Sequence, residues 1–257
     1  MNPKFFNKNF ITSYSQISDS AGTSNANKQK LYDRNNGTYW YSLGETAGTS
    51  TITWTPGSAT TVTRIIIQNC NWKSFTAKYN TNLDFSPAIS VSNSSSTDYY
   101  IEVASQSIND IVFSITDTHS VGDTRKTGQI IITTELMEFA STYGWLVTRG
   151  GEGAPILEQL SDKTYYKTFI RDIVNFNISL EGMSATERDN FKIIYKLNKK
   201  EPVFFIDAPK IYSAGQWDGV GGHYQWGNTW NIHNWLKDLE ANGYTGTIEL
   251  YQAAGIS

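Results

Sequence analysis

A short loop near the N-terminus carries the side chains best suited to bind a hard cation. Asp33, Asn36 and Thr38 offer carboxylate, amide and hydroxyl oxygens within one tight loop, and calcium prefers oxygen ligands. The same residues also suit a polar turn, in which Asp33 accepts hydrogen bonds from neighbouring amides while Trp40 fills the core. The loop therefore predicts either a structural calcium site or a turn without metal.

A second unusual segment, residues 207–230, is rich in aromatic residues and glycine. Long loops of this kind often serve a function or bind a partner, and one small module is not expected to cover so many large side chains. The glycines lack the order of a phosphate-binding loop, and the nearby histidines and aspartates lack the spacing of metal ligands. The segment predicts an assembly surface formed by Tyr212, Trp217, Tyr224, Trp226 and Trp230.

No catalytic centre is evident in the sequence. The chain has a single cysteine, Cys70, three scattered histidines and no G-x-S-x-G motif, so a nucleophile paired with a base is not indicated. A glycosidase needs two converging carboxylates, and the 24 acidic residues leave that alternative open. We expect a protein that is not an enzyme, with an unrecognised glycosidase as the least favoured alternative.

The elements that must position these residues fall into two groups. Up to residue 138 the chain is rich in Ser, Thr and Asn, with short β-branched and aromatic runs that turn residues separate. Many short strands at this spacing indicate a sandwich or barrel. Strands are predicted at residues 51–54, 62–68, 74–79, 99–103, 111–115 and 129–133.

From residue 139 to residue 257 helix and strand patterns alternate, which indicates a smaller α+β module. Apolar and polar residues alternate over 172–180, as in a strand with one buried face. Ser184 and Glu187 have the spacing of a capping box, and the apolar residues after them predict a helix. Further strands are predicted at 203–206 and 247–251, and a second helix at 232–239.

Composition excludes several classes of protein. The 257 residues are 39% hydrophobic and 14% aromatic with a net charge of −3, which indicates a folded chain without the basic surface of a nucleic-acid binder. A single cysteine excludes an intrachain disulfide. Residues 1–10 lack the apolar core of a signal peptide, and no segment has the roughly 20 apolar residues that span a bilayer. We expect synthesis in a cytoplasm, no nucleic-acid partner, no membrane insertion and no cofactor beyond the possible calcium.

The loop around Asp33 also carries a family motif. Asp33, Asn35, Thr38 and Trp40 follow the pattern D-G-N-x-x-T-x-W, and several of the predicted strands follow in the expected order. In these features residues 10–136 resemble the discoidin, or coagulation factor type C, family, which implies a galactose-binding-like jelly-roll β-sandwich over residues 1–138. Arg34 departs from the motif, since the family has glycine there.

The resemblance implies two sites. In carbohydrate-binding relatives this loop often holds a structural calcium ion together with a glutamate of the last strand, and Glu135 is the corresponding residue. Relatives that bind sugars stack an exposed loop aromatic on the sugar ring, which implies a glycan surface at Trp72, Lys73 and Tyr39. Trp72 could equally fold over the edge of the sandwich or be buried against a neighbouring subunit.

The order of elements after residue 139 resembles modules of tailed-phage tail and baseplate proteins. Combined with the sandwich, this predicts a structural virion protein of a phage tail tip, a baseplate or a related injection machine. Such a protein would assemble in the host bacterial cytoplasm into a ring with copies of itself and other tail proteins. The sandwich would then be an adaptor or a weak binder of host surface glycans. A lectin-like carbohydrate-binding protein is the alternative.

Overall fold

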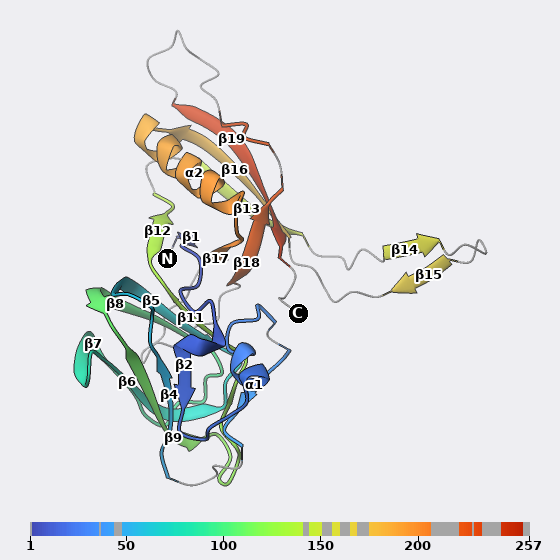
Figure 1. Cartoon of the computed structure of the whole chain (residues 1–257). Coiled ribbons are helices and arrows are strands. Elements are labelled where there is room, and N and C mark those ends of the chain that lie inside the picture. The colour runs from blue at the N-terminus through green and yellow to red at the C-terminus, as the bar shows by residue number, and fades with distance from the viewer. Residues whose placement is uncertain are drawn as a thin grey trace. The chain divides into compact units, whose positions relative to one another are not determined.

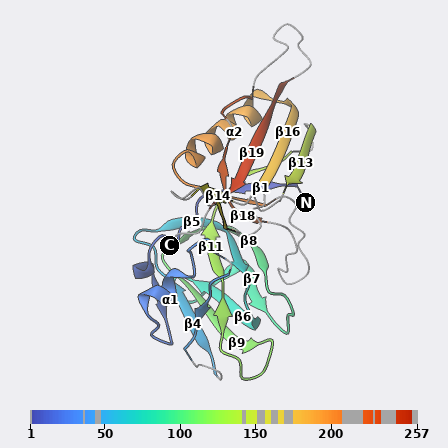
Figure 2. The same cartoon turned by 90° about the vertical axis from the view of Figure 1, so that its right-hand side faces the viewer.

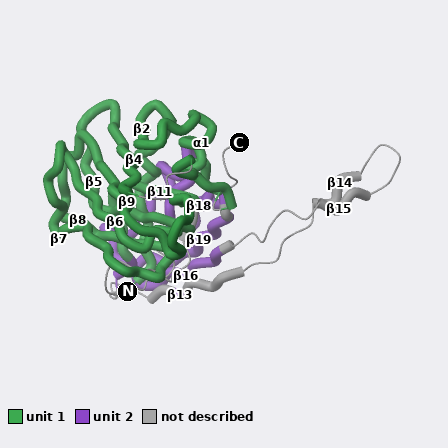
Figure 3. Tube along the Cα trace, turned by 90° about the horizontal axis from the view of Figure 1, so that it is seen from below, with its two compact units in different colours: residues 1–138, 206–221, 254–257 green, residues 139–205, 222–253 purple. Residues whose placement is uncertain are grey.

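The chain divides into two compact units, which Figure 3 colours separately. Unit 1 comprises Met1–Glu138 with Ile206–Gly221 and Ala254–Ser257, and unit 2 comprises Phe139–Phe205 with Gly222–Ala253. Whether the two units are separable domains stays a prediction. The computed structural model describes residues 2–35, 37–43, 48–140, 144–150, 156–159, 165–168, 175–206, 221–227, 229–232 and 243–253.

Unit 1 is a β-sandwich of two antiparallel sheets (Figure 1). The first sheet has the order β2 (Ile17–Asp19), β4 (Ser50–Trp54), β9 (Ile111–Thr118), β6 (Trp72–Tyr79) and β7 (Leu83–Val91). The second sheet has the order β11 (Gln129–Thr133), β5 (Thr60–Gln68) and β8 (Tyr99–Ile108). The chain crosses repeatedly from one sheet to the other, since β5 and β8 interrupt the strands of the first sheet. All six predicted strands are present, and the predicted fold class of the N-terminal half is confirmed.

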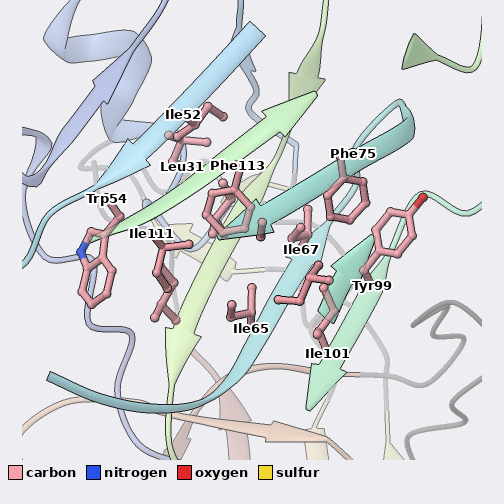
Figure 4. Close-up of a cluster of buried hydrophobic side chains, with 14 of the residues drawn as sticks. Leu31, Ile52, Trp54, Ile65, Ile67, Phe75, Tyr99, Ile101, Ile111 and Phe113 are labelled. Atoms are coloured by element: carbon pink, nitrogen blue, oxygen red, sulfur yellow. The ribbon is translucent and has the colours of Figure 1, made fainter. Parts of the chain in front are cut away.

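The core of unit 1 lies between the two sheets. In β4 the side chains of Ser50, Ile52 and Trp54 are buried while the threonines between them are half-buried, the two-residue period of a strand with one inward face. Figure 4 shows how side chains from both sheets meet in this core. The first sheet contributes Ile52, Trp54, Phe75, Ile111 and Phe113, and the second contributes Ile65, Ile67, Tyr99 and Ile101.

Short elements complete unit 1. Strand β1 (Lys4–Phe6) pairs antiparallel with β12 (Glu135–Glu138), and β3 (Trp40–Tyr41) pairs antiparallel with β10 (Lys126–Thr127). A 3-10 turn η1 (Tyr14–Gln16) and a helical turn α1 (Asn25–Gln29) lie between β1 and β3. Strand β3 contains one tyrosine, Tyr41, and a second, Tyr39, directly precedes the strand.

Unit 2 is an α+β module. Its sheet has the order β17 (Val203–Ile206), β18 (Gly221–Trp226), β19 (Tyr244–Gln252), β16 (Asn175–Met183) and β13 (Gly144–Gly150). Figure 2 shows α2 (Ala185–Asn198) beside β16 and β19, and a separate hairpin joins β14 (Ile156–Gln159) to β15 (Tyr165–Thr168). The predicted helix at 232–239 lies outside the described residues except for Ile232, which is buried.

The start of α2 matches the predicted capping box. Ser184 Oγ accepts a hydrogen bond from the Glu187 amide at 3.2 Å, and Glu187 Oε2 accepts one from the Ser184 amide at 2.7 Å. Phe191 and Ile194 are buried on one face of the helix. In the described part of the chain, no helix is both long and apolar enough to cross a membrane.

Candidate functional site

Two tyrosines flank Trp40, the first residue of β3, and they share the outer face of this segment. The side chain between them, Trp40, is fully buried in the core. Because successive side chains of a strand alternate, Tyr39 and Tyr41 point to the opposite side. Their ring centroids lie 6.0 Å apart with an interplanar angle of 53°, and Tyr41 is 39% exposed. The local sequence Tyr-Trp-Tyr thus presents two aromatic rings at the surface.

Both tyrosines are held by polar contacts with neighbouring segments. The side chain of Asn27 in α1 donates to the Tyr41 carbonyl at 2.8 Å and accepts from the Tyr41 amide at 3.2 Å. Asn69, in the turn between β5 and β6, donates from Nδ2 to the Tyr39 hydroxyl at 2.6 Å. Since the backbone of one tyrosine and the ring of the other are fixed, the pair is positioned before any ligand arrives.

Two lysines lie over the tyrosine rings. Lys126 faces Tyr41 across the β3–β10 pair, and its Nζ lies 4.9 Å from the ring centroid of Tyr39. Lys30, at the end of α1, places its Nζ 6.0 Å from the ring centroid of Tyr41. Both distances are within the range of a cation–π contact. We call Lys30, Tyr39, Tyr41 and Lys126 the tyrosine surface.

The tyrosine surface combines an apolar ring with charged and polar hydrogen-bond donors. Lys126 approaches the ring of Tyr39 to 4.9 Å, whereas Lys30 stays 6.0 Å from the ring of Tyr41. Because Tyr41 is also the more exposed of the two, it offers the ring for stacking. The ammonium groups and the tyrosine hydroxyls can donate to oxygens of a molecule that lies on that ring. Tyr39 was predicted from the sequence, whereas Tyr41 and both lysines were not. The alternation of Tyr39, Trp40 and Tyr41 was the available signal.

The prediction that Trp72 forms a sugar-stacking platform is wrong. Trp72 is the first residue of β6, and its side chain is fully buried. Its ring packs against Phe75 and Phe113, with centroid distances of 5.4 Å and 6.2 Å. Strand β6 begins two residues earlier than the strand predicted at 74–79, so Trp72 belongs to the strand and points into the core.

Lys73 belongs to a different part of the surface. It lines a polar pocket of about 180 Å³ together with Arg125, Asp117 and Val121. The structure therefore divides the predicted glycan set: Tyr39 belongs to the tyrosine surface, Lys73 to the polar pocket and Trp72 to the core.

The side chain of Asp33 is engaged in a polar turn. Its Oδ1 accepts from the Asn35 amide at 2.8 Å and from Gln129 Nε2 at 2.7 Å, and its Oδ2 accepts from Thr38 Oγ1 at 2.5 Å. Arg34 has a φ of +62°, the left-handed conformation that glycine adopts most readily. The arginine thus occupies the backbone conformation for which the family motif uses glycine.

Of the predicted calcium ligands, the structure brings Asp33 and Thr38 together but engages Glu135 elsewhere. Glu135 Oε2 lies 2.9 Å from Lys4 Nζ and 2.6 Å from Arg64 Nη2, so this carboxylate belongs to an ion-pair network. Asp33 instead contacts Gln129, which lies six residues before Glu135 along the chain. Asn36 lies outside the described residues. Among the residues that the structure describes, no three His, Cys, Asp or Glu side chains form a metal-binding cluster.

We expect calcium to leave the stability of the protein unchanged. Binding to the folded state alone would raise the melting temperature by mass action. Asp33 and Thr38 already form a hydrogen bond with each other, and Glu135 forms ion pairs with Lys4 and Arg64. Thermal unfolding should therefore give the same curve in millimolar calcium and in excess chelator. A higher melting temperature in calcium that Asp33→Asn abolishes would contradict this account.

Cys70 is buried in the core of unit 1. Burial raises the pKa of its thiol to about 12, so the group stays protonated near neutral pH. A protonated, inaccessible thiol does not act as a nucleophile.

The comparisons with known proteins give similarity to solved structures only. No protein-family model and no curated protein sequence matches the chain. A mutant of chitosan-binding module 1 from a chitosanase/glucanase of Paenibacillus sp. IK-5 is 14% identical. That match covers 49% of this chain and 98% of the module, with a TM-score of 0.42. The CBM32-1 and CBM32-2 domains of Clostridium perfringens ZmpB, in complex with GalNAc, are 9% identical. That match covers 98% of this chain and 88% of the other, with a TM-score of 0.37.

The predicted assembly surface in unit 2 is wrong for two of its residues. Tyr224 and Trp226 lie in strand β18, not in a loop, and they are 1% and 7% exposed. Tyr224 packs against Phe176, and Trp226 against Tyr195. One small module does cover these aromatics, because helix α2 and the sheet enclose them.

Of the other three residues predicted for the assembly surface, the structure describes only Trp230. Trp230 is half-buried and lies 5.5 Å from Tyr195 and 6.1 Å from Trp226 between ring centroids. Tyr212 and Trp217 lie outside the described residues.

Proposed function

We propose that unit 1 binds carbohydrate through the tyrosine surface. The observation that carries the proposal is the pair formed by Tyr39 and Tyr41, in which Tyr41 is exposed while its backbone is fixed by Asn27. Sugar rings have an apolar face of C–H groups and an edge of hydroxyl groups. An exposed aromatic ring flanked by hydrogen-bond donors complements both, as in small-molecule sites that combine an apolar wall with a few polar groups.

In this proposal the two tyrosines contact different parts of the sugar. Tyr41 supplies the stacking ring because it is the more exposed. Tyr39 supplies its hydroxyl, oriented by Asn69, at the edge of the stacked sugar. A tyrosine loses few rotatable bonds on binding, so it provides contact area at low entropic cost.

Replacing Tyr41 with alanine is expected to weaken carbohydrate binding about thirty-fold, since an aromatic anchor typically contributes about 2 kcal/mol. The chain should first be tested by affinity electrophoresis against a panel of soluble polysaccharides, and the best ligand titrated by calorimetry. Tyr14→Ala is the matched control, because Tyr14 is 45% exposed in η1 and belongs to no part of the tyrosine surface.

The proposal predicts that Tyr14→Ala binds like the parent and that both variants keep its melting temperature. Equal affinity of Tyr41→Ala and the parent would place the binding site elsewhere. A parent chain that binds no polysaccharide of the panel at millimolar concentration would contradict the function itself.

The virion role stays a prediction. Two of the residues expected at the interface, Tyr224 and Trp226, are buried within unit 2, so they do not favour ring assembly. That the chain is not an enzyme, has no nucleic-acid partner and assembles in a bacterial cytoplasm are likewise predictions. Carbohydrate recognition is preferred because it rests on a positioned pair of aromatic side chains.

A further inference from the structure

The tyrosine surface carries positive charge. Lys30 and Lys126 both lie over its rings, and neither forms an ion pair with a carboxylate in the described part of the chain. This is a local property, since the whole chain has a net charge of −3. The two ammonium groups are therefore available to an anion that approaches Tyr41.

Two acidic side chains in the segments next to the tyrosines, Asp98 and Asp33, accept hydrogen bonds from other residues. Asp98 accepts from the Asn69 amide at 3.0 Å and from Thr97 Oγ1 at 2.7 Å, which holds the turn that positions Tyr39. Asp33 is buried and accepts two hydrogen bonds within its loop and a third from Gln129 of β11. Neither carboxylate is paired with Lys30 or Lys126.

We propose that the tyrosine surface selects acidic glycans, whose sugars carry a carboxylate or a sulfate. This inference rests on the proposed function and adds the ligand class. The sugar ring stacks on Tyr41, and its anionic group accepts hydrogen bonds from the ammonium groups of Lys126 and Lys30. Both lysines remain in contact with solvent, so their attraction for the anion is moderate and screened by salt.

The arrangement of Lys126 supports this assignment. Its backbone is fixed, because the amide donates to Asn71 Oδ1 at 2.9 Å and the carbonyl accepts from the Asn71 amide at 3.2 Å. Its side chain extends from the position opposite Tyr41 to the ring of Tyr39. The ammonium group of Lys126 therefore lies beside the stacking ring of Tyr41. Binding to it costs less conformational entropy than binding to a lysine that is free to move.

The test compares three polysaccharides and one double variant. Polygalacturonate supplies a carboxylate, chondroitin sulfate adds a sulfate, and galactan is neutral. Lys30→Gln/Lys126→Gln should weaken binding of one or both acidic polysaccharides about five- to tenfold at low salt, and should weaken galactan binding less than that. Raising the salt concentration should lower the affinity of the parent for the acidic polysaccharides toward that of the variant. The matched control is Lys8→Gln/Lys78→Gln, which removes the same charge away from the tyrosine surface.

Rescue by Lys30→Arg/Lys126→Arg would support charge as the cause, since the positive charge is retained. The inference is overturned if the glutamine variant binds both acidic polysaccharides like the parent, or if the parent prefers galactan. Tighter binding of a single-stranded oligonucleotide than of either acidic polysaccharide would also overturn it, because the surface would then recognise nucleic acid. Loss of all binding in Tyr41→Ala, with no effect of the lysine variants, would retain the proposed function and reject only the ligand class.

Discussion

Replacing Trp72 with alanine is expected to lower the free energy of unfolding of unit 1 by about 3 to 5 kcal/mol. The indole is fully buried between Phe75 and Phe113, so its removal leaves a cavity that the two sheets can fill only in part. Chemical denaturation of the full chain, followed by far-ultraviolet circular dichroism, would measure the loss. If the ring were instead an exposed sugar platform, the variant would keep its stability and lose only binding.

The control for this substitution is Tyr14→Ala, which removes a large but exposed aromatic side chain. It should change the free energy of unfolding by less than about 0.5 kcal/mol. Trp72→Phe should lie between the two, since a smaller ring fills part of the space. A loss below about 1 kcal/mol in Trp72→Ala would mean that the core described for unit 1 is incorrect.

Replacing Glu135 with glutamine is expected to cost about 3 kcal/mol. Its carboxylate is shared by Lys4, which is 4% exposed, and by Arg64, which is 14% exposed. Without the negative charge, two largely buried cations face each other with fewer anionic partners. Glu102→Gln is the matched control, because Glu102 contacts the same two cations but is 42% exposed. Its cost should stay below about 1 kcal/mol.

The pH dependence of this network follows from Lys4. Burial lowers the pKa of Lys4, but its hydrogen bond to Glu135 and the charges of Glu135 and its acidic neighbours raise the pKa more, so the net value lies above the usual 10.5. A group with a raised pKa stabilises the fold fully below its unfolded pKa and loses that contribution as pH rises through the folded value. The stability difference between the parent and Glu135→Gln should therefore be constant at neutral pH and shrink above pH 10.5.

Six strands of unit 1 could be predicted because each has a buried, β-branched or aromatic face. Strand β7 could not, since its nine residues include only three buried side chains and a proline at position 87. Proline lacks the amide donor that an inner strand needs, but β7 lies at the edge of its sheet, where that loss is tolerated. Local sequence carries no information on whether a strand will be at an edge.

The candidate site was only partly predictable for a related reason. Tyr39 was identified, but the alternation of Tyr39, Trp40 and Tyr41 is too short to establish a strand by itself, so Tyr41 was missed. Lys30 and Lys126 reach the surface from segments 96 residues apart, and only the fold brings them together. Trp72 and Glu135 were assigned to sites because of the positions that the family resemblance gives them. In the structure Trp72 packs in the core, and Glu135 forms ion pairs with Lys4 and Arg64.

The most direct measurement is a nuclear magnetic resonance titration of the full chain, labelled on its tyrosine rings, with galacturonate oligosaccharides. Tyr→Phe variants at positions 14, 39 and 41 would assign the relevant signals. The account predicts that the signals of Tyr39 and Tyr41 shift with a common saturation curve while Tyr14 stays unchanged. Saturable shifts confined to other tyrosines, or no shift at millimolar oligosaccharide, would contradict the claim that the tyrosine surface is the binding site for an acidic glycan.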